Sequence, residues 1–427
     1  MRLGGRLAAA IEVLDDMEAR KRPLSVALRD WGSNHRFAGS GDRSAIGNLA
    51  YDALRLASSS AWLAGENSSA AKVLGGVFRL QGMTPEQLKQ TLDGDKFAPD
   101  LPSDAVLQKL HKGDLALADA HVRADIPEWL VPSFEANFAD EWEAEAQAFA
   151  TRPALDMRVN TLKSSQGKVA KALQGAKPTD IARHGLRIPA VLGDRRHPNV
   201  MAEAAYQQGK FEVQDQGSQI VADLVFAQPG EQVLDFCAGA GGKTLALAAA
   251  MENKGQIHAW DADKTRLAPI HERLKRAGVR NAQVHDAHSE PTHLHGKMDR
   301  VVLDAPCSGS GTWRRRPDTK WKLTPEQLEQ RVEEQEAVLA AARNYPRVGG
   351  FLVYITCSVL PEENENQVYA FLEANPEYEL LSAGEVWQDL FGFDKRTPWS
   401  SDMKTITLTP ASTGTDGFFF AVMERRK

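Results

Sequence analysis

From Phe211 to the C-terminus, strand patterns alternate with helix patterns, and this alternation restricts the fold more than any other feature of the sequence. Strand-like runs occur at EQVLDFC, GQIHAWDAD, NAQVHDA, MDRVVLDAPC, FLVYITCS and GTDGFFFAVMERRK, and most of them are separated by helical stretches. Parallel strands joined by helices form a sheet that is covered on both faces. We therefore predict an α/β domain with a doubly wound sheet over residues 211–427.

The part of the chain before this domain is predicted to be helical first and basic afterwards. Residues 1–125 place apolar residues at three- and four-residue spacing, which predicts an all-helical domain. Residues 126–210 predict a connector and a small basic α/β subdomain with a strand at LDMRVNTL. Residues 151–210 hold eleven Lys and Arg against four Asp and Glu, although the whole chain has a net charge of -6. This segment is either a nucleic-acid surface or an ordinary solvated charged face.

Composition excludes some classes of protein. No apolar run approaches the length of a membrane span, and acidic residues interrupt the N-terminal stretch where a signal peptide needs an apolar core. The three cysteines, Cys237, Cys307 and Cys357, are an odd number, which argues against a disulfide framework. We predict a cytoplasmic protein with reduced thiols and no membrane partner.

A glycine-rich turn, CAGAGGKT from Cys237 to Thr244, joins the first strand of the α/β domain to a helix. It ends like the triphosphate-binding loop G-x-x-x-x-G-K-[ST], but Cys237 stands where the first glycine belongs. Read as a dinucleotide turn, it places Thr244 at the third glycine. The next strand ends at Asp261, twenty residues beyond Gly241, where a carboxylate usually binds ribose hydroxyls. A nucleoside-containing cofactor is predicted, while an ATPase loop and a turn needed only for packing stay open.

Two cysteines follow two predicted strands, in Asp304-Ala-Pro-Cys307 and in Thr356-Cys357-Ser358. Ligands of a doubly wound sheet bind at the carboxyl ends of its strands, so both thiols should face the cleft lined by the turn. A thiol beside a nucleoside cofactor suits methylation of pyrimidine carbon 5, because thiolate addition to carbon 6 makes carbon 5 nucleophilic toward the sulfonium methyl of S-adenosylmethionine. Asp304 is placed to hold ring nitrogen 3, and a second group must remove the carbon 5 proton.

Together these motifs resemble the RsmB/Nop/Sun family of RNA cytosine-5 methyltransferases. The matching pieces, in the family's order, are RVNTLK, VQDQGSQ, VLDFCAGAGGKT, LDAPCSGSGTWRRRPDTKW, YITCSVLPEENENQV and GTDGFFFA, and they cover about residue 151 to the C-terminus. The turn departs from the family's usual C-A-A-P-G-G-K-T at Gly239 and Ala240, which is expected to loosen it without removing a contact group. The N-terminal GDRSAIGNLAYDALR is similar to NusB-type helical RNA-binding domains.

The resemblance implies a Rossmann-like methyltransferase sheet that binds S-adenosylmethionine and uses no metal. It implies that Cys357 is the nucleophile, that Cys307 assists release, that Asp304 contacts the target base and that Lys243 organises Asp304. The order of the two thiols does not follow from the sequence alone. The implied cofactor contacts are Cys237, Ala238, Gly239, Ala240, Gly241, Gly242, Lys243, Asp261, Asp286 and Asp304.

RNA is the predicted partner, bound by the basic segment and by the loop from Trp313 to Trp321. Trp313 or Trp321 is expected to stack on an unpaired base, and the alternative is that Trp321 packs in the core. The predicted activity is methylation of cytidine carbon 5 in ribosomal RNA by a monomeric enzyme. Transfer RNA is the alternative substrate, and a non-catalytic RNA-binding assembly factor is the alternative class, which leaves both thiols unexplained. The predicted RNA contacts are Arg158, Asn160, Arg314, Arg315, Arg316 and Lys320.

Overall fold

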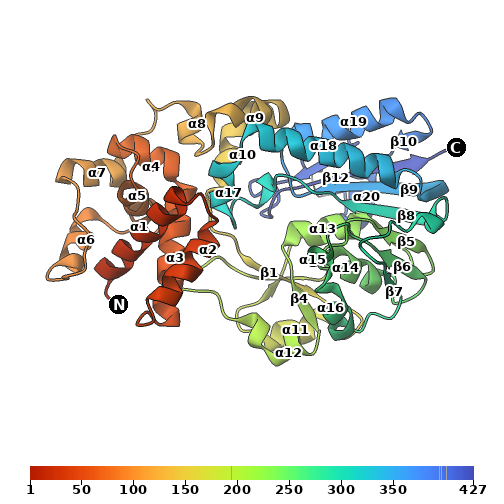
Figure 1. Ribbon diagram of the computed structural model, residues 1–427, viewed down its shortest axis with the longest axis horizontal. Helices are drawn as coiled ribbons and strands as arrows, with labels where there is room; N and C mark the ends of the chain where they lie inside the picture. The colour runs from red at the N-terminus through yellow and green to blue at the C-terminus, as the bar shows by residue number, and fades with distance from the viewer. Residues whose placement is uncertain (194, 394, 396, 401) are drawn as a thin grey trace. The chain divides into compact units, whose positions relative to one another are not determined.

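The computed structural model describes residues 1–427 except 194, 394, 396 and 401 (Figure 1). These residues form two compact units. One consists of residues 1–153, 190–197 and 312–323, and the other of residues 154–189, 198–311 and 324–427. The first unit is helical and the second contains both β-sheets. The domain boundaries predicted after residues 125 and 210 are a different division of the chain, and they remain predictions.

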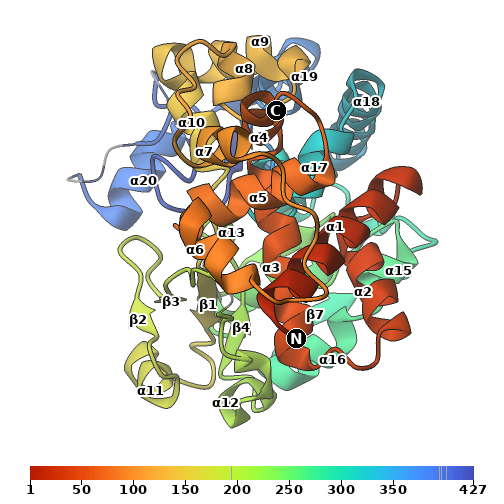
Figure 2. The ribbon, with the colours of Figure 1, turned by 90° about the vertical axis from the view of Figure 1, so that its left-hand side faces the viewer.

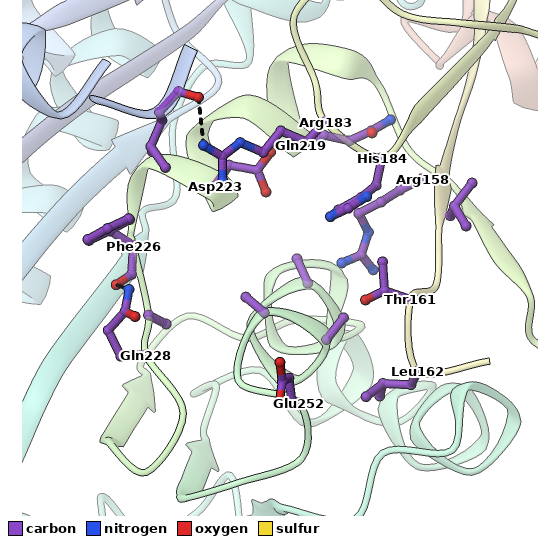
Figure 3. Close-up of a pocket in the computed structure, with 16 residues that line it drawn as sticks. Arg158, Thr161, Leu162, Arg183, His184, Gln219, Asp223, Phe226, Gln228 and Glu252 are labelled. Atoms are coloured by element: carbon purple, nitrogen blue, oxygen red, sulfur yellow. Dashed lines mark hydrogen bonds between the residues drawn. The ribbon is translucent and has the colours of Figure 1, made fainter. Parts of the chain in front are cut away.

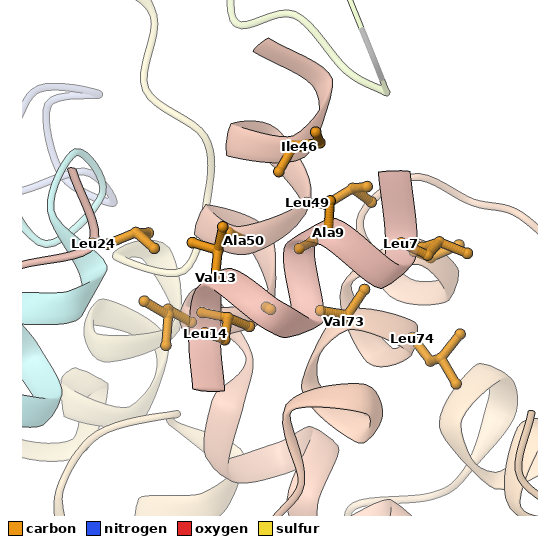
Figure 4. Packing of buried hydrophobic residues seen from close by; sticks show 14 of the residues in the cluster. Leu7, Ala9, Val13, Leu14, Leu24, Ile46, Leu49, Ala50, Val73 and Leu74 are labelled. Atoms are coloured by element: carbon orange, nitrogen blue, oxygen red, sulfur yellow. The ribbon is translucent and has the colours of Figure 1, made fainter. Parts of the chain in front are cut away.

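The helical unit packs its amphipathic helices around one apolar core. In α1, Leu7 and Leu14 lie on the buried face, and they meet Ile46 and Leu49 of α3 and Val73 of α5 (Figure 4). This packing confirms the helical pattern read from the N-terminal sequence. The helices are α1 (Leu3–Ala19), α2 (Leu24–Asn34), α3 (Ser40–Arg55), α4 (Ala57–Ala64), α5 (Ser69–Arg79), α6 (Pro85–Leu92), α7 (Asp104–Lys112), α8 (Ala120–Arg123), α9 (Val131–Phe138), α10 (Trp142–Ala148) and α17 (Pro317–Lys322).

Residues 312–323, which include α17, belong to this helical unit although they lie between strands in the sequence. Trp313 is buried, stacks on Phe134 with ring centroids 6.1 Å apart and meets Phe149 edge-on. The indole of Trp321 donates to the backbone oxygen of Leu54 at 2.7 Å. Both tryptophans therefore pack within the protein, and the expectation that one of them stacks on an RNA base is corrected.

Trp313→Ala is expected to lower the free energy of unfolding of the helical unit by about 3–5 kcal/mol, because it removes a large buried side chain and leaves a cavity. Urea unfolding followed by far-ultraviolet circular dichroism measures the loss. Trp62→Ala is the matched control, since Trp62 is 41% exposed and its loss should cost well under 1 kcal/mol. Equal losses from the two variants would contradict the packing role.

A small antiparallel sheet with strand order β2-β3-β1-β4 is formed by three strands of the basic segment and by β4, which follows it (Figure 2). The predicted strand LDMRVNTL contains β1, whose Asp156 faces Arg187 of β3 and accepts from its Nε at 2.6 Å. Helices lie on this sheet and bury Val169 and Tyr206 against it. The elements are β1 (Leu155–Val159), α11 (Gln166–Ala172), β2 (Lys177–Pro178), β3 (Gly185–Ile188), α12 (Ala204–Gln207) and β4 (Phe211–Val213).

The larger sheet has the strand order β10-β12-β9-β8-β5-β6-β7, with β11 paired to β12. Strands β7, β6, β5, β8 and β9 are parallel and β12 is antiparallel. The elements are α13 (Gln216–Leu224), β5 (Gln232–Asp235), α14 (Gly242–Ala250), β6 (Gln256–Ala259), α15 (Lys264–Leu267), α16 (Ile270–Ala277), β7 (Ala282–Val284), β8 (Met298–Asp304), α18 (Pro325–Ala342), β9 (Pro346–Thr356), α19 (Glu365–Ala374), β10 (Tyr378–Leu380), α20 (Ala383–Phe391), β11 (Ile406–Leu408) and β12 (Phe418–Arg425).

Helices cover both faces of this sheet, as the doubly wound pattern predicts. On one face Val233 and Val302 pack with α13, α14 and α20, and on the other Leu234 and Leu303 pack with α18 and α19 (Figure 1). Successive strand residues thus enter opposite cores. The amphipathic spacing of DKTRLAPIHERLKRAG, residues 263–278, predicts one helix, but the structure has two helices there. They break at Pro269, which lacks the N–H that a helix interior needs. None of the helices in the described parts of the chain combines the length and the apolar character that a membrane crossing requires.

Candidate active site

The glycine-rich turn lies between β5 and α14, at the carboxyl end of the parallel strands. Gly239 and Gly241 have φ angles of 48° and 82°, a region that glycine adopts without steric cost. A Cβ atom on Gly241 would lie 2.6 Å from Cγ1 of Ile270, so the turn packs directly on α16. A Cβ atom on Gly239 would meet only the tips of Arg266 and Asp261, at 3.6 and 3.8 Å. The turn is therefore closed toward α16 and open near Asp261, which fits a ligand that approaches the backbone.

Asp261 follows β6 and is bound to the glycine-rich turn. Its Oδ2 accepts from the N–H of Gly239 at 2.9 Å, and its Oδ1 accepts from the N–H of Asp263 at 2.8 Å. The carboxylate is buried. Asp263 itself caps α15, because its side chain accepts from the backbone of Thr265 and Arg266. Asp261 is thus held beside the turn, where a ribose ligand would need it.

Asp286 follows β7, the strand beside β6. Its side chain is exposed and accepts from the N–H of His288 at 3.0 Å, while its backbone oxygen accepts from the indole of Trp260 at 3.1 Å. The turn, Asp261 and Asp286 therefore follow three neighbouring strands and lie along one edge of the sheet.

Lys243, the second residue of α14, extends its side chain to the end of β8. Its Nζ donates to Oδ2 of Asp304 at 3.2 Å and to Oγ of Ser218 at 2.9 Å, and it lies 5.2 Å from the ring centre of Phe418. The lysine side chain is buried, whereas the Asp304 side chain is 34% exposed. The buried cation fixes one carboxylate oxygen, and the carboxylate remains accessible to a ligand.

The two strand-end cysteines meet. Cys307 Sγ and Cys357 Sγ are 3.4 Å apart, because β8 and β9 are adjacent parallel strands in which Asp304 pairs with Ile355. The hydrogen bond with Cys357, together with burial, raises the pKa of the Cys307 thiol well above its ordinary value. Cys307 therefore keeps its proton in the free protein, and the two sulfur atoms share a hydrogen bond in which either can donate.

Cys237 stands apart from this pair. It packs against the apolar cluster on the α18 and α19 face of the sheet. Burial raises the pKa of its thiol, so the group stays neutral. A buried neutral thiol among apolar side chains is typical of a structural cysteine and not of a catalytic one.

Glu363 is a site residue that the sequence reasoning missed. It lies fully buried just after the Thr-Cys-Ser run, and its carboxylate accepts from the N–H of Ser308 at 2.6 Å and from the Ser308 hydroxyl at 2.5 Å. The signal in the sequence was the acidic run PEEN that follows Cys357. An acid placed directly after a strand end, in an otherwise buried segment, needs donors nearby and so indicates a buried anchor.

The predicted RNA contacts in the loop from residue 313 to 321 are corrected at Arg314 and Lys320. Both side chains are buried inside the helical unit. The Arg55 guanidinium donates to the backbone oxygen of Arg314 at 2.6 Å, and burial lowers the pKa of Lys320 to about 8. Side chains in this position cannot reach a phosphate group. Arg316 is exposed and Arg315 is half-buried, so these two keep the predicted role.

Arg158 and Asn160 of the basic segment are also buried. The amide of Asn160 donates to the backbone oxygens of Gly209 and Ala277 at 2.8 and 2.7 Å, so it ties β1 to α16, and its predicted RNA contact is corrected. Arg158 lines a pocket of about 630 Å³ together with Asp223, and exposed residues such as Gln228 and Glu252 line it as well, so the predicted RNA contact of Arg158 stays a prediction (Figure 3). Burial lowers the pKa of Arg158 to about 10. The cavity adjoins the C-terminal half of α14, away from the turn at the start of that helix.

A pH dependence is expected from Asp235, which ends β5. The residue is fully buried; Oδ2 accepts from Thr244 at 2.6 Å, and Oδ1 has no hydrogen-bond partner among the described residues. Burial raises its pKa from 3.8 to about 7. Between these values the native state holds a proton that the unfolded chain has lost, so the free energy of unfolding falls as the pH rises from about 4 to about 7. Asp235→Asn should flatten this slope in urea titrations across that range, and an unchanged slope would contradict the assignment.

Two family models match the chain. One, described as 16S rRNA methyltransferase RsmB/F, matches residues 223–424, and the other, an RsmF/B-like ferredoxin-like domain, matches residues 126–190. Ribosomal RNA small subunit methyltransferase B of Citrobacter koseri is 31% identical over 329 residues, which cover 76% of this chain and 73% of that protein.

Solved structures share the fold. The crystal structure of PH0851 has a TM-score of 0.72 at 24% identity and covers 99% of both chains. NSun6 from Pyrococcus horikoshii, solved with the S-adenosylmethionine analogue SFG, has a TM-score of 0.61 at 23% identity and covers 70% of this chain and 98% of that one. The fold and the family match define an S-adenosylmethionine-dependent methyltransferase with a Rossmann-like sheet. Its sequence identity over most of both chains shows that the protein belongs to the RsmB/F methyltransferase family.

Proposed function

We propose that the protein methylates carbon 5 of a cytidine in ribosomal RNA through a covalent bond between Cys357 and the base. The observation that carries the proposal is the contact of 3.4 Å between the sulfur atoms of Cys307 and Cys357, at the strand edge that also presents the Lys243–Asp304 pair. A protein that only binds RNA has no use for two touching thiols at such a place. The names of the relatives, which are ribosomal RNA methyltransferases, support the choice of substrate.

The cofactor contacts follow from the same edge of the sheet. We assign the turn from Cys237 to Lys243 to the cofactor, with Asp261 on the ribose hydroxyls and Asp286 near the adenine. The buried Asp261 carboxylate beside an open Gly239 suits a diol, because charge-assisted hydrogen bonds are strong in such surroundings. S-adenosylmethionine, when bound, supplies an electrophilic methyl group on its sulfonium sulfur.

The thiolate of Cys357 attacks carbon 6 of the cytosine, and the electron pair of the carbon 5–carbon 6 double bond moves to carbon 5. Ring nitrogen 3 takes the proton that the Cys357 thiol loses on attack and returns it when Cys357 leaves. Asp304, fixed by Lys243, accepts from this N–H and so stabilises the charge that develops on the ring. Carbon 5 then forms its bond to the methyl group and still carries its proton, which must be removed before the base can leave.

Cys307 removes that proton. In the free enzyme the neighbouring Cys357 sulfur is the largest cause of the raised pKa of Cys307. Once the Cys357 sulfur is bonded to carbon 6 it can no longer carry a negative charge, so this cause is lost. The Cys307 thiol, whose pKa burial and Glu363 still raise, then releases its proton to solvent more readily than in the free enzyme. Its thiolate then takes the carbon 5 proton, the electron pair re-forms the ring double bond, and Cys357 leaves as a thiolate.

Bisulfite sequencing of total RNA from cells with and without the gene tests the proposal. We expect one or more protected cytidines in ribosomal RNA to disappear when the gene is deleted and to return with the wild-type gene but not with Cys357→Ala. Protection lost in transfer RNA instead would replace the substrate, and no lost site in any RNA would overturn the cytidine assignment. A cytoplasmic location and a monomeric state accompany this proposal as predictions.

Arg316→Ala is expected to weaken RNA binding about equally for all sequences and to reduce the slope of log K against log salt by about 0.7–1, because one phosphate contact is lost. Filter binding across a salt series measures both effects, with calorimetry of the cofactor as the readout that should not change. Arg29→Ala is the control, since Arg29 is also an exposed arginine of the helical unit. An unchanged slope with Arg316→Ala would remove this loop from the RNA surface.

A further inference from the structure

We propose that Glu363 is a positioning residue that holds Cys307 in place for release of the methylated base. The proposal rests on the proposed function, because it assumes that Cys307 removes the carbon 5 proton. Glu363 ends the short turn Pro361–Glu363 and has no solvent exposure. It does not touch the reacting atoms, so any effect on the reaction must pass through the loop that carries Cys307.

The Glu363 carboxylate fixes the peptide that follows Cys307. Its Oε1 accepts from the N–H of Ser308 at 2.6 Å, and its Oε2 accepts from the Ser308 hydroxyl at 2.5 Å. Two charge-assisted bonds to neighbouring donors of one residue set both the position and the direction of that residue. The backbone on the C-terminal side of Cys307 is therefore defined by Glu363.

Gln335 of α18 completes the support from the other side. Its Nε2 donates to the backbone oxygen of Pro306 at 2.9 Å and to Oε1 of Glu363 at 3.1 Å. Pro306 directly precedes Cys307 and Ser308 directly follows it. Glu363 and Gln335 thus form hydrogen bonds to the residues on both sides of Cys307.

The hydrogen bonds between Glu363 and Ser308 are expected to be strong, because a buried carboxyl group needs hydrogen-bond donors to offset its loss of water. Burial without hydrogen bonds is costly, and burial raises the pKa of Glu363. Ser308 supplies two of its donors, Gln335 supplies another, and the side chain of Ser358 also forms a hydrogen bond with it. The hydroxyl of Tyr354 donates to the backbone oxygen of Glu363 at 2.7 Å and anchors the residue to β9. The two Ser308 bonds are the ones that are lost if the loop of Cys307 moves away.

The loop that carries the nucleophile has separate supports. The N–H of Gly311 donates to the backbone oxygen of Cys357 at 2.9 Å, and the hydroxyl of Thr356 donates to the Asn364 side chain at 2.6 Å. These two bonds do not involve the Glu363 carboxyl group, although its side chain also bonds that of Ser358 next to Cys357. Because the carboxyl group holds both the N–H and the hydroxyl of Ser308, its loss is expected to displace the thiol of the D-A-P-C loop more than that of Cys357.

The test uses the full-length protein, labelled S-adenosylmethionine and ribosomal RNA from cells that lack the gene. Glu363→Ala should form the methylated protein–RNA adduct at close to the wild-type rate but release it on the order of a hundredfold more slowly, as expected for a misplaced catalytic group. The adduct then accumulates on a denaturing gel. Glu363→Gln keeps an oxygen for the Ser308 N–H and should restore most of the release rate, while Ser308→Ala should show a smaller delay.

Two comparisons separate positioning from general damage. In the Cys307→Ala background, Glu363→Ala should add no further adduct, because the group that it positions is absent. Glu373→Ala, at an exposed glutamate of the next helix, is the matched control and should behave like wild type. Cofactor affinity measured by calorimetry should be the same in all variants, which shows that the catalytic unit is folded.

The outcomes distinguish the two proposals. Wild-type release by Glu363→Ala, or equal loss of adduct formation and release, overturns the positioning role while Cys307→Ala still traps an adduct. If Cys307→Ala itself forms no adduct, the covalent mechanism fails. If Glu363→Ala does not fold, Ser308→Ala decides the question: slower release supports the positioning role of Glu363, and unchanged release overturns it.

Discussion

Cys357→Ala should abolish methylation and form no covalent adduct, whereas Cys307→Ala should accumulate a denaturant-resistant protein–RNA adduct that already carries the methyl group. The physical reason is that one sulfur makes the bond to carbon 6 and the other removes the carbon 5 proton that must leave before this bond can break. A denaturing gel with RNA and labelled cofactor measures both effects. Loss of turnover in each variant should exceed about a thousandfold, as for other groups that act as a unit.

The third cysteine supplies the control for this pair. Cys237→Ala removes a thiol that packs in an apolar cluster. Because Cys237 belongs to the turn assigned to the cofactor, the variant is assayed at saturating S-adenosylmethionine, where it should neither trap RNA nor prevent the adduct. An adduct with Cys357→Ala and none with Cys307→Ala would reverse the two roles. Full methylation by both single variants would end the covalent mechanism.

Asp304→Asn should lower kcat by about 10²–10³, because a preorganised charge at the base is lost in the state where the ring carries charge. The effect should fall on adduct formation, so that Asp304→Asn combined with Cys307→Ala traps far less RNA than Cys307→Ala alone. Single-turnover methylation at saturating RNA measures the rate, and calorimetry should show that S-adenosylmethionine still binds.

Asp299→Asn is the matched control for this change. Asp299 lies at the opposite end of β8 and accepts from Arg347 at 2.8 Å, so its replacement alters the same strand without reaching the site. Equal loss of kcat in the two variants would mean that the strand is disturbed and not the contact with the base. A normal rate with Asp304→Asn would move the base contact to another group.

The fold of the catalytic unit could be predicted from the sequence because its information is local. Strands such as β5 and β8 are short apolar runs that end in polar residues, and the helix that begins at Pro325 carries its own signal, since Thr324 and Gln327 form a capping box. The strand alternation then leaves few topologies, as parallel crossovers are right-handed. The break at Pro269 was also readable, but the amphipathic pattern on both sides concealed it.

The candidate site was predictable where it depends on strand ends. Asp261, Asp304, Cys307 and Cys357 each follow a predicted strand, and parallel strands bring their carboxyl ends to one edge. The contact between Glu363 and Ser308 was not predictable in the same way. It depends on which buried donors surround the carboxyl group, and the spacing of residues along the chain does not show this.

The basic residues also show that side-chain accessibility could not be predicted from the sequence. Arg314 and Lys320 read as a phosphate-binding run in WRRRPDTKW, yet they are buried in the helical unit. Charge in a sequence states what a side chain carries, and only packing states whether solvent or RNA can reach it. Long basic side chains can also be buried when they donate to backbone oxygens, as Arg55 donates to the backbone oxygen of Arg314.

By itself the sequence determined the doubly wound sheet, the turn for a nucleoside cofactor and the presence of two thiols at strand ends, because these depend on residue type and periodicity. Tertiary structure alone decided that the sulfur atoms of Cys307 and Cys357 touch and that Glu363 closes on Ser308. It also decided which arginines are accessible. The physical reason is that hydrogen bonds, burial and pKa values depend on distances between residues far apart in the chain, and these distances exist only after the strands have paired and the helices have packed.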